Sequence, residues 1–298
     1  MVLRIVEVLS PVVLVAAVGF ALRRTGFDAR SALQKLSIYV LGPPFIVTSL
    51  ATSEARLGDL GRVGGFAAAM FVALALVAAA ISVAYRFHRD EAAASILALA
   101  ANNCGNYGLP IVLYGFGASA LPIGVAFVMM HFVVQILVGL PIASLAGSRN
   151  RGRLHLAPVV PYLGAVVVGL LLKGFAVELP ALVERPLTLL GQAWIPLLIL
   201  LLGMELADIS LRGIAGRAAL LAVAKLAIPP FLALGLLAAF RFDGLWFRVL
   251  LLQASTPTAV NSLLFAREFD VRPDLVAGAL AISTLGSIVT MSILLAVL

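Results

Sequence analysis

Apolar runs of about 20 residues, separated by short polar connections, follow one another along the whole chain. A run of this length is enough for one helix to cross the hydrocarbon core of a bilayer. The pattern predicts ten spans, near residues 3–22, 32–50, 62–85, 92–113, 119–146, 157–175, 186–206, 217–240, 245–265 and 274–298. Scattered Gly, Ala and Ser residues in these runs allow helices to pack closely. We therefore predict an all-α membrane protein of ten transmembrane helices.

The two halves of the chain carry similar landmarks at a nearly constant shift of about 150 to 155 residues. The paired positions are Pro11 with Pro161, Gly19 with Gly169, Arg62 with Arg217, Tyr85-Arg86-Phe87 with Phe240-Arg241-Phe242, Asn106 with Asn261, and Gln135 with Thr290. Five spans per half is an odd number, so the second half must enter the membrane upside down. The sequence predicts inverted five-helix repeats at 1–146 and 157–298, joined by a cytoplasmic linker at 147–156. Chance similarity between Ala-, Leu- and Val-rich spans is the alternative.

Composition supports the membrane assignment, because 62% of the residues are hydrophobic and only 12% are charged, against about 25% charged in a typical soluble domain. The net charge of +7 does not indicate nucleic-acid binding, since the basic residues are scattered through short loops. Thirteen Lys and Arg residues fall on one side of the predicted topology and seven on the other. Because basic loops stay in the cytoplasm, this count places both termini outside.

Polar residues and helix breakers interrupt the fourth apolar run. The segment reads Asn102-Asn103-Cys104-Gly105-Asn106-Tyr107-Gly108-Leu109-Pro110. Glycine and proline are poor helix formers, and lipid offers no hydrogen-bond partner to the groups that unwinding exposes. We predict that 102–110 is partly unwound, with Gly105, Gly108 and Pro110 as helix breakers, and that its amides and half-helix N-termini bind a carboxylate or similar anion. A simple kink, with Asn side chains bonding neighbouring helices, is the alternative.

Pro257 interrupts the ninth run in a similar way. The surrounding polar residues are Ser255, Thr256, Thr258 and Asn261. Ser and Thr can bond back to carbonyls of their own helix, which needs no ligand. The pairing of Asn261 with Asn106 favours a site instead, in which two broken helices cross near the middle of the bilayer. The predicted substrate-binding residues here are Asn102, Asn103, Asn106, Thr258 and Asn261, together with the backbone amides of the crossing.

Lys225 lies deep in the eighth run with no adjacent acid. A membrane-embedded lysine costs about 2.5 to 3.5 kcal/mol on insertion scales. We therefore predict that Lys225 attracts the anionic substrate, and snorkelling towards the headgroups is the alternative.

Two polar stripes lie in the fifth and tenth runs. His131 and Gln135 are one helical turn apart and share a face, and Thr284, Ser287 and Thr290 form the second stripe. We include Gln135 and Thr290 in the predicted substrate path, although hydrogen bonding between helices explains both stripes nearly as well. The acids Glu7 and Glu205 lie towards the ends of their runs, where we expect water to solvate them.

Several segments resemble the auxin efflux carrier family. They are the fourth-run segment given above, Ala254-Ser255-Thr256-Pro257-Thr258-Ala259-Val260-Asn261 with Ala266-Arg267-Glu268-Phe269, Ser283-Thr284-Leu285-Gly286-Ser287-Ile288-Val289-Thr290, and Leu202-Gly203-Met204-Glu205-Leu206-Ala207. The resemblance implies a scaffold domain and a transport domain, each built from both inverted repeats, with helices four and nine crossing as in bile-acid and sodium/proton transporter folds. It also implies an elevator-like carrier in the inner membrane and a homodimer. Plant members export the indole carboxylate auxin, and bacterial members are described as malonate or malate permeases.

One departure from the family concerns charge. Asn102-Asn103-Cys104 stands before Gly105 where many relatives place a basic residue. The resemblance therefore implies that Lys225 supplies the missing positive charge.

We expect a secondary carrier of a small organic anion, a mono- or dicarboxylate, that uses no cofactor and no metal. A passive anion channel and a ligand sensor without transport are the alternatives. The sequence has no P-loop, no acidic pair at the centre of a span and no Cys/His/carboxylate group with metal-ligand spacing. These features do not support direct use of ATP, a carboxylate proton relay or a metalloenzyme, and we do not expect an enzyme.

Overall fold

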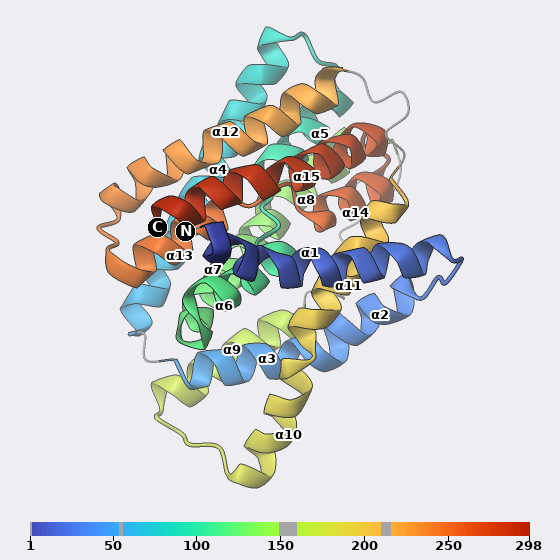
Figure 1. The fold of residues 1–298 in the computed structure, drawn as a ribbon. Helices are drawn as coiled ribbons and strands as arrows, with labels where there is room; N and C mark the ends of the chain where they lie inside the picture. Colours follow the sequence, from blue (N-terminus) through green and yellow to red (C-terminus); the bar gives the residue numbers. More distant parts are fainter. Residues whose placement is uncertain (1, 54–55, 149–159, 210–215) are drawn as a thin grey trace.

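The computed structural model describes residues 2–53, 56–148, 160–209 and 216–298, with the side chains of residues 2–6 and 57 left aside. All regular elements in these ranges are helices (Figure 1). Five helical stretches are long and apolar enough to cross a membrane, namely Gly58–Ala84, Ala118–Ala146, Ala181–Ala207, Gly216–Ala239 and Pro273–Val297. Val160–Gly174 and Gly244–Ala254 are shorter apolar helices. Most of the predicted linker at 147–156 lies outside the described residues.

The first half contains eight α-helices. They are α1 (Val2–Arg24), α2 (Arg30–Leu36), α3 (Gly42–Ala51), α4 (Leu57–Ala84), α5 (Arg89–Ala100), α6 (Leu109–Phe116), α7 (Leu121–Val134) and α8 (Leu140–Ala146). π-helical turns at Ser37–Leu41, Cys104–Gly108 and Gln135–Gly139 precede α3, α6 and α8. Each of these three α-helices has proline in its first turn. Because proline lacks an N–H and its ring clashes with the carbonyl four residues earlier, the preceding turn widens instead of continuing as α-helix.

The second half contains seven α-helices. They are α9 (Val160–Gly174), α10 (Ala181–Gln192), α11 (Trp194–Ala207), α12 (Gly216–Ala239), α13 (Gly244–Ala254), α14 (Val260–Phe269) and α15 (Pro273–Val297). Every apolar run that predicts a span coincides with one of these helices or with a consecutive pair of them. The hydrophobic pattern therefore locates the helices well, but it does not show the widened turns.

The helices pack as two groups. The first body contains α1, α2, α3, α9, α10 and α11, in which α1 lies along α11 and α3 along α9. The second body contains α4 to α8 and α12 to α15, packed around buried rings such as Phe66, Phe71 and Phe127. Gly19 and Gly203 bring α1 and α11 into backbone contact, because a methyl group on either glycine would overlap a carbonyl of the other helix.

Corresponding places in the two halves have similar local geometry. Arg86 after α4 and Arg241 after α12 both adopt left-handed backbone angles, with φ of 51° and 55°. The guanidinium carbon of Arg62 lies 4.6 Å from the ring centre of Phe242, and that of Arg217 lies 4.9 Å from the ring centre of Phe87. The paired arginines of the two halves therefore stack on the paired phenylalanines of the opposite halves.

Candidate substrate site

The fourth and ninth helical segments both break, and the two breaks contact each other. The fourth breaks between α5 and the π turn Cys104–Gly108, and the ninth between α13 and α14. Asn102 and Thr258 form an antiparallel β-bridge at the contact. The Asn103 N–H donates to the Pro257 carbonyl at 2.8 Å, and the Ala259 N–H donates to the Ala101 carbonyl at 3.0 Å. The unwound stretches thus satisfy part of each other's backbone where lipid could not.

The fourth break is shorter and earlier than the sequence predicts. Only residues 101–103 are unwound, because Cys104–Gly108 is a π turn and Pro110 lies in the first turn of α6. Pro110 therefore follows the widened turn and does not stand in the break. Gly108 provides space, because a methyl group there would overlap the Gln253 amide, whereas Gly105 has no close neighbour, the nearest atom to an added methyl being 3.8 Å away. Pro257 does stand inside the break of its own segment.

The carbonyl end of α5 is supplied with donors from other segments. Ser262 Oγ donates to Leu97 O at 2.7 Å, Thr258 Oγ1 to Ala98 O at 2.9 Å, and Lys225 Nζ to Leu99 O at 2.7 Å. The last four carbonyls of a helix have no partner within that helix. These three side chains therefore stabilise the α5 end at the crossing.

The backbone amides of the breaks are largely occupied. The Asn102 N–H donates to His131 Nε2 at 2.9 Å, and the Thr258 N–H donates to Ser283 Oγ at 3.2 Å. The N–H groups of Asn103 and Ala259 bond across the bridge, as described above. The prediction that these backbone amides bind the substrate is therefore wrong for these four residues, because protein acceptors already engage them.

A cavity of about 460 Å³ lies between the two bodies beside the crossing. Polar and aromatic residues of the first body that line it are Gln34, Ser37, Tyr162, Trp194 and Glu205. Polar residues of the second body that line it are Asn102, Asn103, Asn106, His131, Gln135, Asn261 and Glu268. Phe132, Leu198 and Phe265 contribute to an apolar remainder. The volume lies within the usual range for small-molecule sites.

The structure brings together five of the predicted binding residues and leaves out three. The five are Asn102, Asn103, Asn106, Asn261 and Gln135. Thr258 caps α5 instead. Thr290 lies in α15, where its hydroxyl bonds to the Ser287 carbonyl at 3.4 Å, and Lys225 is fully buried without reaching the cavity wall.

Four buried nitrogen atoms on the cavity-lining side chains have no hydrogen-bond partner within the described part of the chain. They are Asn102 Nδ2, Asn103 Nδ2, Gln135 Nε2 and His131 Nδ1. His131 Nε2 accepts the Asn102 N–H, so the neutral imidazole carries its proton on Nδ1. As placed, all four are donors. A ligand with acceptor oxygens matches them, because buried donors are rarely left unpaired.

Two helix N-termini also contribute to the cavity wall. Cys104, Gly105 and Asn106 begin the helical stretch that leads into α6, and Val260 and Asn261 begin α14. First-turn N–H groups have no partner within their own helix, and a helix N-terminus carries roughly half a positive charge. Both ends add positive potential to the side of the cavity that holds the unpaired donors.

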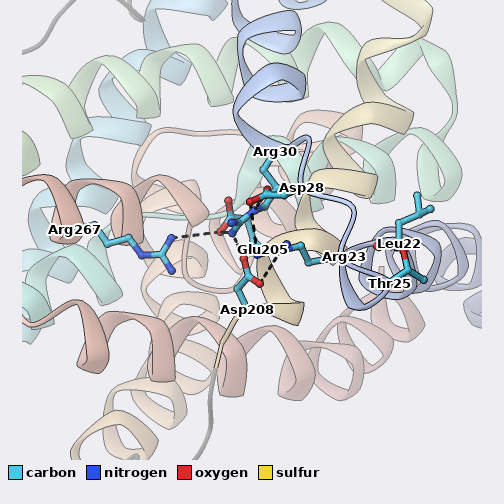
Figure 2. A network of polar contacts seen from close by, with 8 residues as sticks. All are labelled: Leu22, Arg23, Thr25, Asp28, Arg30, Glu205, Asp208 and Arg267. Carbon is cyan, nitrogen blue, oxygen red and sulfur yellow. Dashed lines mark hydrogen bonds and ion pairs between the residues drawn. The ribbon is translucent and has the colours of Figure 1, made fainter.

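Glu205 borders the cavity and is almost fully buried, so the prediction that water solvates it at the end of its helix is wrong. It is only 2% exposed. Gln34 Nε2 donates to its Oε1 at 3.2 Å. Its Oε2 lies 3.7 Å from Arg267 Nη1 and 3.9 Å from Arg30 Nη1 (Figure 2). The last turn of α11 packs against α2, and no periodicity in the sequence indicates that neighbour. The sequence feature that could have indicated a functional position for Glu205 is the likeness of residues 202–207 to a segment of the auxin efflux carrier family.

Comparison with known proteins identifies the class of this chain. A profile of the family described as "Membrane transport protein" matches residues 152–295. The second half of the chain is therefore similar to this family of membrane transport proteins. The resemblance to auxin efflux carriers is thereby confirmed, and the family indicates a transporter rather than an enzyme.

Two relatives that carry transporter names agree with this similarity. A Methanothermobacter thermautotrophicus protein named "Uncharacterized transporter" is 27% identical over 293 residues, which is 95% of either chain. A Rhizobium meliloti protein named "Putative malonate transporter" is 27% identical over 218 residues, which is 69% of this chain and 67% of the relative.

Further ion pairs lie at helix ends in both bodies. In the first body, Arg23 binds Asp208 at 2.8 Å, and Arg30 also pairs with Asp208 (Figure 2). A hydrogen bond from the Arg30 guanidinium lowers the pKa of Asp28. These contacts connect the end of α1 and the start of α2 to the end of α11.

In the second body, Glu91 at the start of α5 is the centre of a second ion-pair group. Arg217 of α12 and Arg272 before α15 both bind its carboxylate, Arg272 at 2.7 Å, and the His88 N–H donates to it at 3.0 Å. Burial by itself would raise the pKa of Glu91, but the His88 N–H and the two guanidinium groups outweigh it and lower that pKa. Glu91 thus connects three helices of one body.

Proposed function

We propose that this protein is a secondary carrier that moves a small organic anion, a mono- or dicarboxylate, across the inner membrane. The observation that carries the proposal is the group of four unpartnered nitrogen donors beside the cavity, on Asn102, Asn103, His131 and Gln135. An ionised carboxylate has acceptor sites only, so it can pair with such a group without leaving a donor unsatisfied.

The electrostatics of the crossing support an anion as the ligand. The carbonyl end of α5 is covered by capping donors, whereas the two N-terminal helix ends contribute to the cavity wall. Asn106 and Asn261 stand in these two first turns and add amides to the site. The name of the Rhizobium meliloti relative includes malonate, which supports a carboxylate as the cargo.

The proposed architecture is ten spans in two inverted five-helix repeats, with the fourth and ninth helices crossing. The reciprocal stacking of Arg62 on Phe242 and Arg217 on Phe87 supports the repeat. The left-handed turns at Arg86 and Arg241 support it as well. The first body would serve as scaffold and the second as transport domain, each built from both repeats, with both termini outside. A homodimer stays a prediction from the family resemblance.

The proposed mechanism is alternating access, in which the second body moves against the first as in an elevator. The cavity lies between the two bodies, and the four unpaired donors belong to the second body alone. A bound carboxylate would therefore move together with its donors, while the aromatic wall of the first body stays in place.

Transport by purified protein in liposomes tests the proposal. Labelled malonate and a panel of other mono- and dicarboxylates would be offered to the wild type and to Gln135→Ala and Asn106→Ala. A lost hydrogen bond to a charged group costs about 1.5 kcal/mol or more, so we expect KM to rise about tenfold. Gln192→Ala, which removes an exposed amide of α10, is the matched control.

The kind of transport decides between a carrier and a channel. A carrier shows saturable exchange and counterflow, whereas a passive channel shows steady current without counterflow. Uptake that Gln135→Ala and Asn106→Ala leave unchanged would remove the cavity from the transport path, and a wild type that takes up none of the acids would overturn the proposed function.

A further inference from the structure

Lys225 of α12 lies behind the cavity wall. Its side chain is fully buried, and its Nζ donates to Leu99 O at 2.7 Å and to Asn102 Oδ1. The lysine does not line the cavity, but Asn102 does. Lys225 therefore reaches the proposed substrate only through Asn102.

The contact with Lys225 determines which way the Asn102 amide points. An ammonium group has three donors and no acceptor. The amide must therefore turn its oxygen towards Lys225, which leaves Nδ2 as the group available to a ligand. Asn102 Nδ2 is one of the buried nitrogens that has no partner in the described part of the protein.

The backbone of the same unwound segment also determines which nitrogen of His131 carries the hydrogen. With Leu99 O and Asn102 Oδ1 both held by Lys225, the Asn102 N–H donates to His131 Nε2 at 2.9 Å. An imidazole that accepts at Nε2 carries its hydrogen on Nδ1. The contacts of Lys225 and Asn102 therefore leave two atoms available to a ligand, Asn102 Nδ2 and His131 Nδ1. Both atoms are hydrogen-bond donors, and neither is an acceptor.

We propose that Lys225 is a positioning residue that sets the hydrogen-bond polarity of the anion site without touching the substrate. This inference rests on the proposed function and deepens it, because it names the chemical feature that the site selects. The site takes an ionised carboxylate and rejects the corresponding primary amide, whose NH₂ group would meet donors. Sites built from buried donors discriminate strongly against ligands that cannot accept from them.

The charge of Lys225 assists the same selection. The negative end of the α5 dipole lies next to the ammonium group and offsets part of the cost of burying it. The positive charge lies one side chain away from the cavity, where low dielectric weakens Coulomb attraction less than water does. An anion in the cavity gains this attraction without having to strip Lys225 of its own hydrogen bonds.

The test compares malonate with malonamide as competitors of labelled substrate in liposomes, with a thermal-shift assay of the same ligands. In Lys225→Met the donors are lost and the Asn102 amide is free to turn. We expect malonate affinity to fall about tenfold and the preference for acid over amide to fall with it. Lys225→Arg, which keeps a charged donor, should restore part of the preference. Lys173→Met is the matched control, since Lys173 donates to the Ser53 carbonyl within the first body.

Asn102→Asp provides a second test of the proposal that leaves Lys225 in place. One carboxylate oxygen would accept from Lys225, and the other would present an acceptor where Nδ2 now stands. Malonate binding should be lost and malonamide binding should appear, which is a reversal that mere destabilisation does not produce.

The outcomes separate the two proposals. If the wild type prefers the acid and both Lys225→Met and Asn102→Asp keep that preference, the positioning role is overturned and the carrier function stands. If the wild type shows no acid dependence with malonate or the wider carboxylate panel, the proposed function fails first, and the role of Lys225 fails with it. Should Lys225→Met not fold, Asn102→Asp and Lys225→Arg decide.

Discussion

Arg267 of α14 places its Nη1 3.7 Å from Oε2 of Glu205 in α11, and this ion pair joins the two bodies beside the cavity. The pairs of Arg23 with Asp208 and of Arg272 with Glu91 each stay within one body. If the second body moves against the first, the Arg267 contact must separate in every cycle, whereas the other two need not.

The first prediction concerns that contact. Arg267→Gln should raise the maximal exchange rate about two- to fivefold with little change in KM, because a contact of about 1 kcal/mol or less no longer resists separation. Counterflow at saturating substrate measures the effect. Arg23→Gln is the control, since it breaks a pair inside the first body. Equal behaviour of the two variants would show that the Arg267 pair does not limit the motion.

The second prediction concerns acid stability. The pKa of Glu91 is lowered in the folded protein, so its contribution to stability is full above the unfolded-chain pKa of about 4.3 and is lost as the pH falls through the lower folded-state pKa. Glu91→Gln should lower the free energy of unfolding by about 2 kcal/mol at neutral pH. It should also make that free energy fall less steeply as the pH becomes acidic. Thermal unfolding between pH 3 and pH 7 measures both. A variant that loses stability at low pH as steeply as the wild type would contradict this role of ionised Glu91.

A third prediction concerns the contact of α1 with α11. Gly203→Ala should destabilise the protein by about 1 to 3 kcal/mol, because the new methyl group overlaps the Ala16 carbonyl and the helices must separate. Gly164→Ala in α9 is the control, since no atom lies within 4 Å of the added methyl. Melting temperatures in one detergent compare the two. Equal temperatures would mean that the helices adjust without cost.

The fourth prediction couples Gly108 to Gln253. Gly108→Ala should destabilise the protein by about 1 to 3 kcal/mol, because the methyl group overlaps the Gln253 amide. In the double variant with Gln253→Ala much of this loss should be recovered, since the closest obstacle is gone, leaving a Thr256 methyl at 3.1 Å, and neither polar atom of Gln253 has a partner among the described residues. Gly105→Ala should be tolerated, as the nearest atom is a Val128 methyl at 3.8 Å. Additive losses in the double variant would contradict the coupling.

The sequence predicts the positions of the helices and the two interrupted segments because both depend on local composition. Apolar length defines a span, and Asn102 and Pro257 stand out in any apolar run. The role of a polar side chain depends instead on which helix faces it. Lys225 binds the α5 end, Thr258 caps the same end and Glu205 meets α2, and each of these contacts joins residues more than 100 positions apart.

The same limit explains the error about the backbone amides. Unwinding predicts free N–H groups, but it does not show that a second unwound stretch and His131 accept from them. The three proline-associated π turns were also predictable only in part. Proline is visible in the sequence, whereas the widened turn before it requires space in the surrounding packing.

The first body contributes rings such as Trp194 and Tyr162 to the cavity wall, while the unpaired nitrogens all come from the second body. In the proposed carrier, the donors that would bind a carboxylate and the rings that would contact the rest of the substrate thus belong to separate helices. If that proposal holds, substitutions of these rings would change the size of metabolite that the cavity admits and leave the carboxylate-binding donors unchanged.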